Sequence, residues 1–171
     1  SDADVSGAGD NTTTDTVTVV SPDRRVQVAF RLMPAGGRPS VACYCVTFGG
    51  KQLISWSSLS LDLSPDGMLG HDLRIKRVKR STRDQTYRLV AGKTSKARDH
   101  CNEAVISLEE QSGHRRLQLV FRAYNDGVAF RYQVPAQPAL GDFTLAAEHS
   151  TFHIAWNPTA YVLPVPSYTT T

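Results

Sequence analysis

The sequence has little of what marks several large classes of protein. It has only three cysteines and no Cys-x-x-Cys pair, which argues against a disulfide-dense scaffold and against a Cys/His zinc site. No apolar run approaches the roughly 20 residues that a membrane-spanning helix needs. No segment repeats apolar residues at spacings of three and four over several turns, so no long helix is expected. With 171 residues, the chain is also too short for a complete (β/α) barrel, which takes about 250.

Catalytic signatures are equally scarce. The sequence contains no Gly-x-Ser-x-Gly elbow, no phosphate-binding glycine-rich loop, no His-Glu-x-x-His pair and no EF-hand loop. Asp99 and Glu103 are close in sequence, but nothing marks them as the facing carboxylate pair that glycoside hydrolysis requires. His149 and His153 would lie about 13 Å apart on an extended strand, too far to share one ion. We therefore predict no catalytic residue and no metal ligand.

Short strands with turn residues between them are what the sequence has in abundance. Residues 25–32 and 59–63 alternate apolar and polar side chains with the period of two that half-buried strands show. The clearest pair, 117–124 and 128–134, flanks Asn125-Asp126-Gly127, where Asp-Gly could supply the positive φ values of a tight hairpin turn. This pattern predicts an all-β fold, an antiparallel β-sandwich. Further strands are predicted over 16–20, 41–48, 52–54, 73–79, 85–90, 103–109, 143–145 and 151–154.

The three cysteines are best interpreted as buried free thiols. Cys43 and Cys45 are two residues apart on one strand, a spacing poorly suited to a disulfide. The alternative is one inter-strand bridge from Cys101 to Cys43 or Cys45, if the compartment is oxidising.

The formal net charge of +3 is concentrated in one segment, Arg74–Arg80, which carries Arg74, Lys76, Arg77, Lys79 and Arg80. One interpretation is a polyanion-binding strip for nucleic acid or acidic polysaccharide. We favour a strand with an irregular cationic face and with Ile75 and Val78 partly buried, because no aromatic residues interleave with the cations. No nucleic-acid partner and no membrane partner are expected.

The chain reads as one domain with a short polar segment before it. Residues 1–15 are small and polar and predict a flexible leader, and residues 16–171 form the β-sandwich. No signal peptide is visible at the start. Trp56, Trp156 and Tyr161 could form a sugar-stacking surface, with core or interface positions as the alternative.

One stretch of the sequence carries a specific motif in addition to the alternation of a strand. Residues 119–132, LVFRAYNDGVAFRY, resemble the hairpin phrase F-R-x-Y/F-N-D-G-V/L-A/G-F-R-Y in the N-terminal domain of glycoside hydrolase family 97. Residues 20–28, 59–63, 98–103 and 148–152 resemble other segments of that domain in the same order. Five collinear segments are far more specific than any one of them, so the chain is identified as similar to this family.

The resemblance implies an enzyme in three parts: an N-terminal β-sandwich like that of galactose mutarotases, a catalytic (β/α) barrel and a small C-terminal β domain. Family members hydrolyse α-glucosides or α-galactosides, with a calcium ion near the active site. The catalytic carboxylates belong to the barrel, which this chain lacks. The acidic residues of the calcium-binding region are missing around Val162–Tyr168, so no ligand is carried over. The family also implies a periplasmic or secreted location.

We therefore expect a non-catalytic N-terminal β-sandwich domain, incomplete at its C-terminal end, that supports carbohydrate binding and the active site of the barrel. The alternatives are a stand-alone carbohydrate-binding module and, less favoured, a polyanion-binding module using Arg74–Arg80. Missing strands would leave sheet edges and apolar faces uncovered, so the isolated chain is expected to dimerise, to pack on a partner or to be marginally stable. The predicted carbohydrate-binding or domain-interface residues are Asn102, Glu103, Trp156 and Tyr161.

Overall fold

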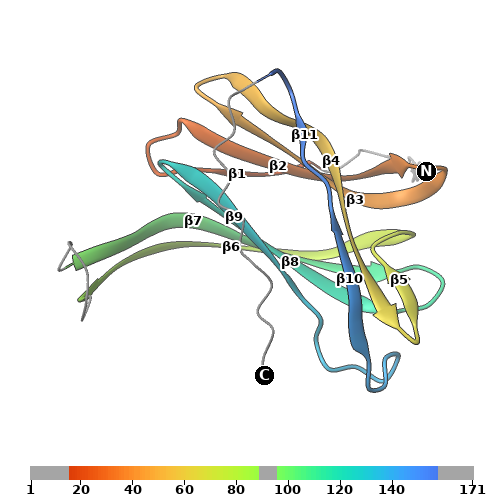
Figure 1. Cartoon of the computed structure of the whole chain (residues 1–171). Coiled ribbons are helices and arrows are strands. Elements are labelled where there is room, and N and C mark those ends of the chain that lie inside the picture. The colour runs from red at the N-terminus through yellow and green to blue at the C-terminus, as the bar shows by residue number, and fades with distance from the viewer. Residues whose placement is uncertain (1–15, 89–95, 158–171) are drawn as a thin grey trace, which may run out of the picture.

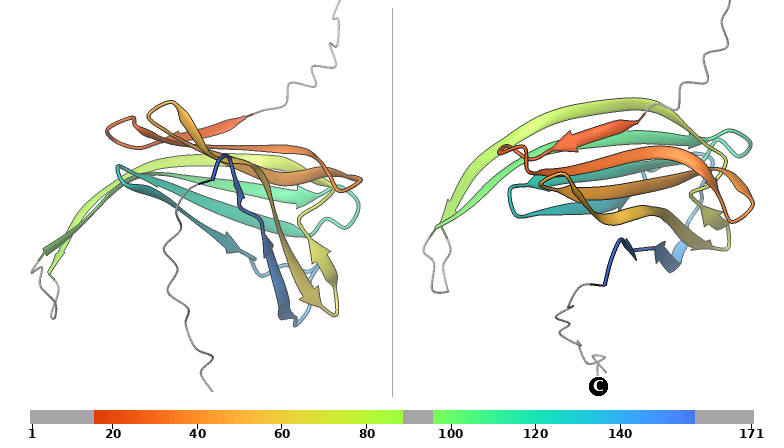
Figure 2. Two further views of the ribbon diagram at one scale, coloured as in Figure 1. Left: turned by 45° about the horizontal axis from the view of Figure 1, so that its top comes forward. Right: turned by 90° about the horizontal axis from the view of Figure 1, so that it is seen from above.

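A computed structural model describes residues 16–88 and 96–157 of the chain. All regular structure in these two ranges is β-strand, and none of it is a helix that could cross a membrane. The strands form two antiparallel sheets that stack as two layers (Figures 1 and 2). The predicted antiparallel β-sandwich is confirmed. The predicted leader, residues 1–15, and Tyr161 lie outside the described residues.

The two sheets differ in size. The larger, sheet A, has the strand order β1-β2-β3-β4-β10, with β5 and β11 also paired to β4; the smaller, sheet B, has the order β6-β7-β8-β9. Sheet A consists of β1 (Val17–Val20), β2 (Val26–Ala35), β3 (Arg38–Phe48), β4 (Lys51–Ser64), β5 (Gly67–Leu69), β10 (Thr144–Ser150) and β11 (His153–Ile154). Sheet B consists of β6 (Leu73–Arg88), β7 (Lys96–Glu110), β8 (Arg116–Tyr124) and β9 (Gly127–Gln133).

The prediction of separate strands over 73–79 and 85–90 is wrong, because β6 is continuous. Its partner β7 pairs with it along its whole length, so backbone hydrogen bonds carry the strand through the polar residues 80–86. This hairpin runs past the end of sheet A, as Figure 2 shows. Its far half has no opposing sheet to bury a face against, which explains why it lacks the apolar alternation that sequence analysis relies on. The predicted strands over 52–54 and 59–63 are likewise one strand, β4.

The predicted hairpin after β8 is present, but its turn differs in detail. Tyr124 pairs with Gly127, so the two-residue loop is Asn125-Asp126 and Gly127 opens β9. None of these three residues has the positive φ that the Asp-Gly pair was expected to supply. The side chain of Asn125 instead accepts a hydrogen bond from the backbone N–H of Asp23 at 3.0 Å, which ties this turn to the β1–β2 loop.

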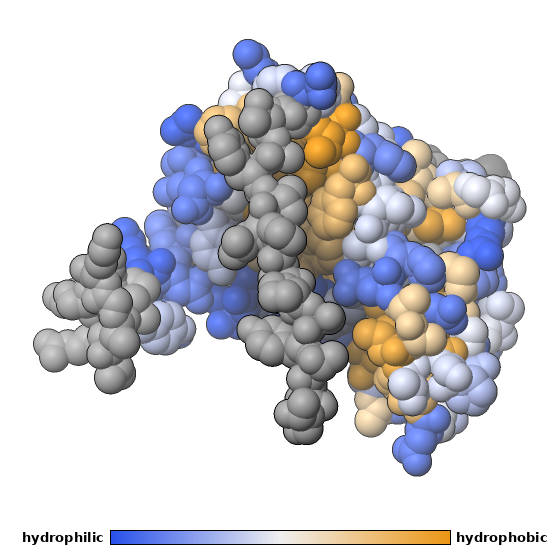
Figure 3. Space-filling view, viewed as in Figure 1, coloured by the Kyte–Doolittle hydropathy of each residue, from blue (hydrophilic) through white to orange (hydrophobic). Residues whose placement is uncertain are grey.

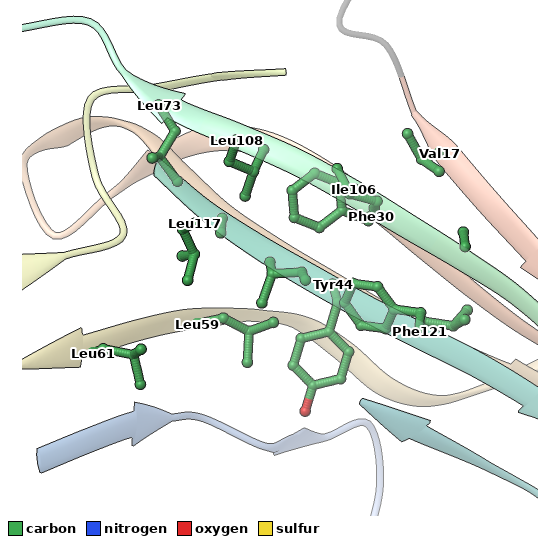
Figure 4. Close-up of a cluster of buried hydrophobic side chains, with 14 of the residues drawn as sticks. Val17, Phe30, Tyr44, Leu59, Leu61, Leu73, Ile106, Leu108, Leu117 and Phe121 are labelled. Atoms are coloured by element: carbon green, nitrogen blue, oxygen red, sulfur yellow. The ribbon is translucent and has the colours of Figure 1, made fainter. Parts of the chain in front are cut away.

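The core lies between the two sheets. Phe121 of β8 contacts Phe30 of β2 and Tyr44 of β3, with ring centroids 6.0 and 6.2 Å apart, and all three side chains are fully buried. The Tyr44 hydroxyl donates a hydrogen bond to the carbonyl of Thr151 at 3.0 Å, so the polar group of this buried side chain has a partner. Around these rings lie the apolar residues that the period-two pattern predicted, among them Leu59, Leu61, Ile106, Leu108 and Leu117 (Figure 4).

The cysteines are buried and free, in agreement with the sequence interpretation. Cys43 and Cys45 point away from the face of β3 that carries Tyr44 into the core. Burial raises the pKa of Cys43 to about 11 and also raises the pKa of Cys45 and Cys101. These thiols are therefore protonated and unreactive at neutral pH.

Candidate functional site

Asn102 fastens sheet B to the free edge of sheet A. Among the described strands, β1 ends the order of sheet A, so no described strand pairs with its outward backbone groups. The Asn102 amide nitrogen donates to the carbonyl of Val20 at 2.7 Å, and the Thr82 hydroxyl donates to the Asn102 amide oxygen at 2.8 Å. The Arg80 guanidinium donates to the carbonyl of Thr18 on the same edge. Both polar ends of Asn102 are thus used inside the domain.

Glu103 points to the opposite, outer face of sheet B and sits between two arginines. Its carboxylate accepts a hydrogen bond from Nε of Arg122 at 2.7 Å and lies 3.3 Å from Nε of Arg83, and the residue is only 7% exposed. Burial acts to raise its pKa, but the hydrogen bond from Arg122 and the two positive charges outweigh burial, so the pKa of Glu103 lies below its usual value. An acid that donates a proton to a leaving group needs the reverse shift.

Asn102 and Glu103 border an open depression of about 450 Å³ at the β1 edge, with residues 18–20 and 80–82 as its other walls. Among the described residues, no aromatic ring lines this depression. A sugar in this depression would meet hydroxyl, amide and backbone groups without a stacking platform. The two residues therefore border one depression, but Trp156 of the predicted site does not.

Trp156 supplies an aromatic surface elsewhere, just after β11. Trp156 is 56% exposed. Its indole N–H donates a hydrogen bond to the carbonyl of Gln52 at 2.8 Å, which fixes the orientation of the ring. Trp56 differs, because the guanidinium of Arg31 covers its ring at 4.2 Å from the centroid. Of the two tryptophans, Trp156 is the more available platform.

Sequence analysis missed an apolar groove on the side of the sandwich where β9 and β10 end the two sheets. The groove has a volume of about 370 Å³. Figure 3 shows hydrophobic surface along β10 and over β11 on this side. The sequence signal for this groove was the alternation of apolar residues in 128–134 and 143–156. The same alternation is typical of ordinary strands with one buried face, so it did not indicate a groove. Its apolar lining comes from Leu61, Leu63, Phe130, Tyr132, Val134, Phe143 and Leu145.

Large apolar side chains remain exposed along this same side. Phe143, Leu145, Phe152, Ile154 and Trp156 are between 39% and 56% exposed. Contiguous exposed apolar surface of this kind marks an interaction site on a soluble protein. We call this surface, from Phe143 to Trp156 together with the groove, the open side.

The buried carboxylates among the described residues are engaged in ion pairs. Glu103 is held by arginines on sheet B, and Glu110 accepts from Arg115 at 2.6 Å. Within residues 16–88 and 96–157, no group of three or more His, Cys, Asp or Glu side chains is arranged to hold a metal ion. His149 and His153 belong to different strands, β10 and β11, and do not form such a group.

These features define the class of the protein: a two-layer antiparallel β-sandwich domain, with one edge fastened by side chains and the opposite side apolar and open. Comparison with known proteins gives the family. The family description "Glycosyl-hydrolase 97 N-terminal" matches residues 19–171, so the chain belongs to the N-terminal domains of glycoside hydrolase family 97.

Individual relatives agree with this assignment. A retaining alpha-galactosidase of Bacteroides thetaiotaomicron is 25% identical over 115 residues, which is 67% of this chain and 16% of that protein. A glycoside hydrolase family 97 enzyme in complex with panose, from Pseudoalteromonas sp. strain K8, superposes with a TM-score of 0.73 at 21% identity, over 81% of this chain and 20% of that one. A beta-arabinopyranosidase superposes with a TM-score of 0.70 at 26% identity, over 81% and 21%. The chain thus spans between 16% and 21% of the length of these relatives.

Proposed function

We propose that this chain is the non-catalytic support domain of a family 97 glycosidase, and that the rest of that enzyme packs against the open side. The observation that carries the proposal is the asymmetry of the sandwich. At the β1 side, Arg80 and Asn102 satisfy the exposed edge, whereas the β9–β10 side leaves an apolar groove and a row of exposed apolar side chains. A surface of this kind gains stability when another apolar surface covers it.

Substitutions on the open side test this proposal in the full-length enzyme. Leu145→Asp and Phe152→Ser remove apolar contact area, so we expect a lower melting temperature and weaker hydrolysis. Tyr87→Ser is the matched control, because Tyr87 is similarly exposed at 48% but lies on β6, away from the open side. In the isolated chain, the same two substitutions should reduce self-association measured by light scattering. Unchanged stability and activity in both variants would contradict the proposal.

The parent enzyme is proposed to hydrolyse α-glucosides or α-galactosides in the periplasm or outside the cell. Support comes from the family and from the retaining alpha-galactosidase among its relatives. Calcium is proposed as a cofactor of the parent enzyme, as the family resemblance implies, and no ligand for it is assigned to this chain. The isolated chain should release no p-nitrophenol from p-nitrophenyl α-glucoside or α-galactoside, whereas the full-length enzyme should hydrolyse one of them. Turnover by the isolated chain would contradict a support role.

Direct carbohydrate binding by this chain is the second candidate, favoured by the exposure of Trp156. Titration with maltose or melibiose should then quench tryptophan fluorescence saturably, and Trp156→Ala should abolish the effect. Trp56→Phe is the control, because Arg31 covers the Trp56 ring. A flat titration would leave the support role as the function of the chain.

A further inference from the structure

The outer face of sheet B is strongly cationic, and its cations come from more than one strand. The strand register places Lys79, Val105, Val120 and Arg131 in one row across all four strands. Arg77 lies two residues before Lys79 in the same regular stretch of β6, opposite Ser107, so it is on the same face as Lys79. Arg80, by contrast, is turned to the β1 edge. The sequence segment Arg74–Arg80 is therefore split, and the cationic face gathers residues from three strands.

Some of the cations on this face are already neutralised. Glu103 pairs with Arg83 and Arg122, and Glu109 pairs with Arg74 and Lys76. Asp99 lies on the same face farther out on the projecting hairpin, opposite Gln85. Within the described ranges, Arg77, Lys79 and Arg131 form no ion pair, and all three are exposed. The face thus keeps free positive charge at both of its edges, because Arg77 and Lys79 lie on β6 and Arg131 on β9.

We propose that this face binds a linear anionic polysaccharide, carrying carboxylate or sulfate groups, through Arg77, Lys79 and Arg131. Lys79 and Arg131 are separated by three strand spacings, about 14 Å, so a chain with repeated anionic groups can reach both at once. The depression between Arg122 and Arg131 measures only about 70 Å³, so the ligand would lie along the surface. Binding of this kind depends on charge and weakens as salt screens it.

Three other kinds of partner fit this face less well: a protein, duplex DNA and single-stranded nucleic acid. A protein partner needs an apolar centre to its interface, and every large exposed apolar residue of the described chain except Tyr87 lies within residues 143–156. Duplex DNA admits a helix or a two-stranded ribbon into its major groove, not a four-stranded sheet. Single-stranded nucleic acid needs a series of stacking rings, which the row from Lys79 to Arg131 lacks.

Heparin binding tests the proposal. The protein should bind heparin at 50 mM NaCl and lose it well below 1 M. The double variant Lys79→Gln/Arg131→Gln should bind several-fold more weakly, with a slope of log Kd against log [NaCl] that is lower by about two. The control Arg38→Gln/Lys51→Gln removes the same charge from exposed positions of sheet A and should bind like the unchanged protein.

Three results would overturn the inference. The first is no binding to either heparin or polygalacturonate at 50 mM NaCl. The second is equal weakening by the two double variants, which would show attraction to net charge and no defined face. The third is tighter binding to a duplex oligonucleotide than to heparin at equal salt, which would assign the face to nucleic acid. Binding to polygalacturonate but not to heparin would support the inference and identify carboxylates as the recognised groups.

Discussion

Replacing Glu103 by glutamine should destabilise the domain by about 2 kcal/mol at pH 7. The substitution keeps the shape of the side chain but leaves Arg122 and Arg83 facing a neutral group, where they now meet a carboxylate at 2.7 and 3.3 Å. Breaking a fully buried ion pair costs about 3–5 kcal/mol and breaking an exposed one about 0–1 kcal/mol. The Glu103 side chain is 8% exposed, but those of Arg122 and Arg83 are 24% and 38% exposed, so an intermediate value applies.

Urea unfolding followed by circular dichroism measures this change. With an m-value of about 2 kcal/mol/M, the midpoint should fall by about 1 M. Asp84→Asn is the matched control: Asp84 binds Arg98 through two bonds of 2.7 Å, but that pair is exposed and its loss should have little effect. Equal midpoints for Glu103→Gln and Asp84→Asn would refute the reasoning.

The pH dependence provides a second check on the same residue. The pKa of Glu103 is lowered in the folded protein from its ordinary value of 4.5. Its contribution to stability is therefore complete above pH 4.5 and is lost as the pH falls through the folded pKa. The stability difference between the unchanged protein and Glu103→Gln should be constant from pH 7 to 6 and shrink below pH 4.5. A difference that does not change with pH would mean that charge is not its cause.

Three further predictions concern other parts of the domain. Phe121→Ala should lower the free energy of unfolding by about 3–5 kcal/mol, because Phe121 is fully buried against Phe30 and Tyr44; a loss below 1 kcal/mol in urea unfolding would place the core elsewhere. Asn102→Ala should remove the hydrogen bond to the Val20 carbonyl and speed amide hydrogen exchange in β1. Asn102→Asp should have the same effect, because a carboxylate cannot donate this hydrogen bond. Unchanged exchange in both variants would show that Asn102 does not fasten the edge. Cys43 should resist thiol labelling at pH 8 in the native state and react in urea, because it is buried and its pKa is raised to about 11; labelling at equal rates would contradict its burial.

The all-β class, the hairpin over 117–134 and the family could be read from the sequence. The arrangement of the candidate site residues could be predicted from the sequence only in part. The sequence pointed to Asn102 and Glu103 as a pair, but adjacent strand residues face opposite sides, so one fastens β1 and the other pairs with arginines on the outer face. Trp156 was singled out as a candidate binding residue, but its separation in the fold from the other two residues depended on how β11 pairs with β4.

What the sequence determined by itself is local: the period-two alternation that makes a strand, the turn residues between strands, and the motif of residues 119–132. The tertiary structure decided which strands become neighbours and in what register, and a register is set by contacts between residues far apart in the chain. The pairing of β6 with β7 made one strand of two predicted ones. Strand alternation separated Arg80 from Lys79, and the register of all four strands of sheet B brought Lys79 and Arg131 onto one face. Free edges at β9 and β10, which no local pattern encodes, left the open side apolar and exposed.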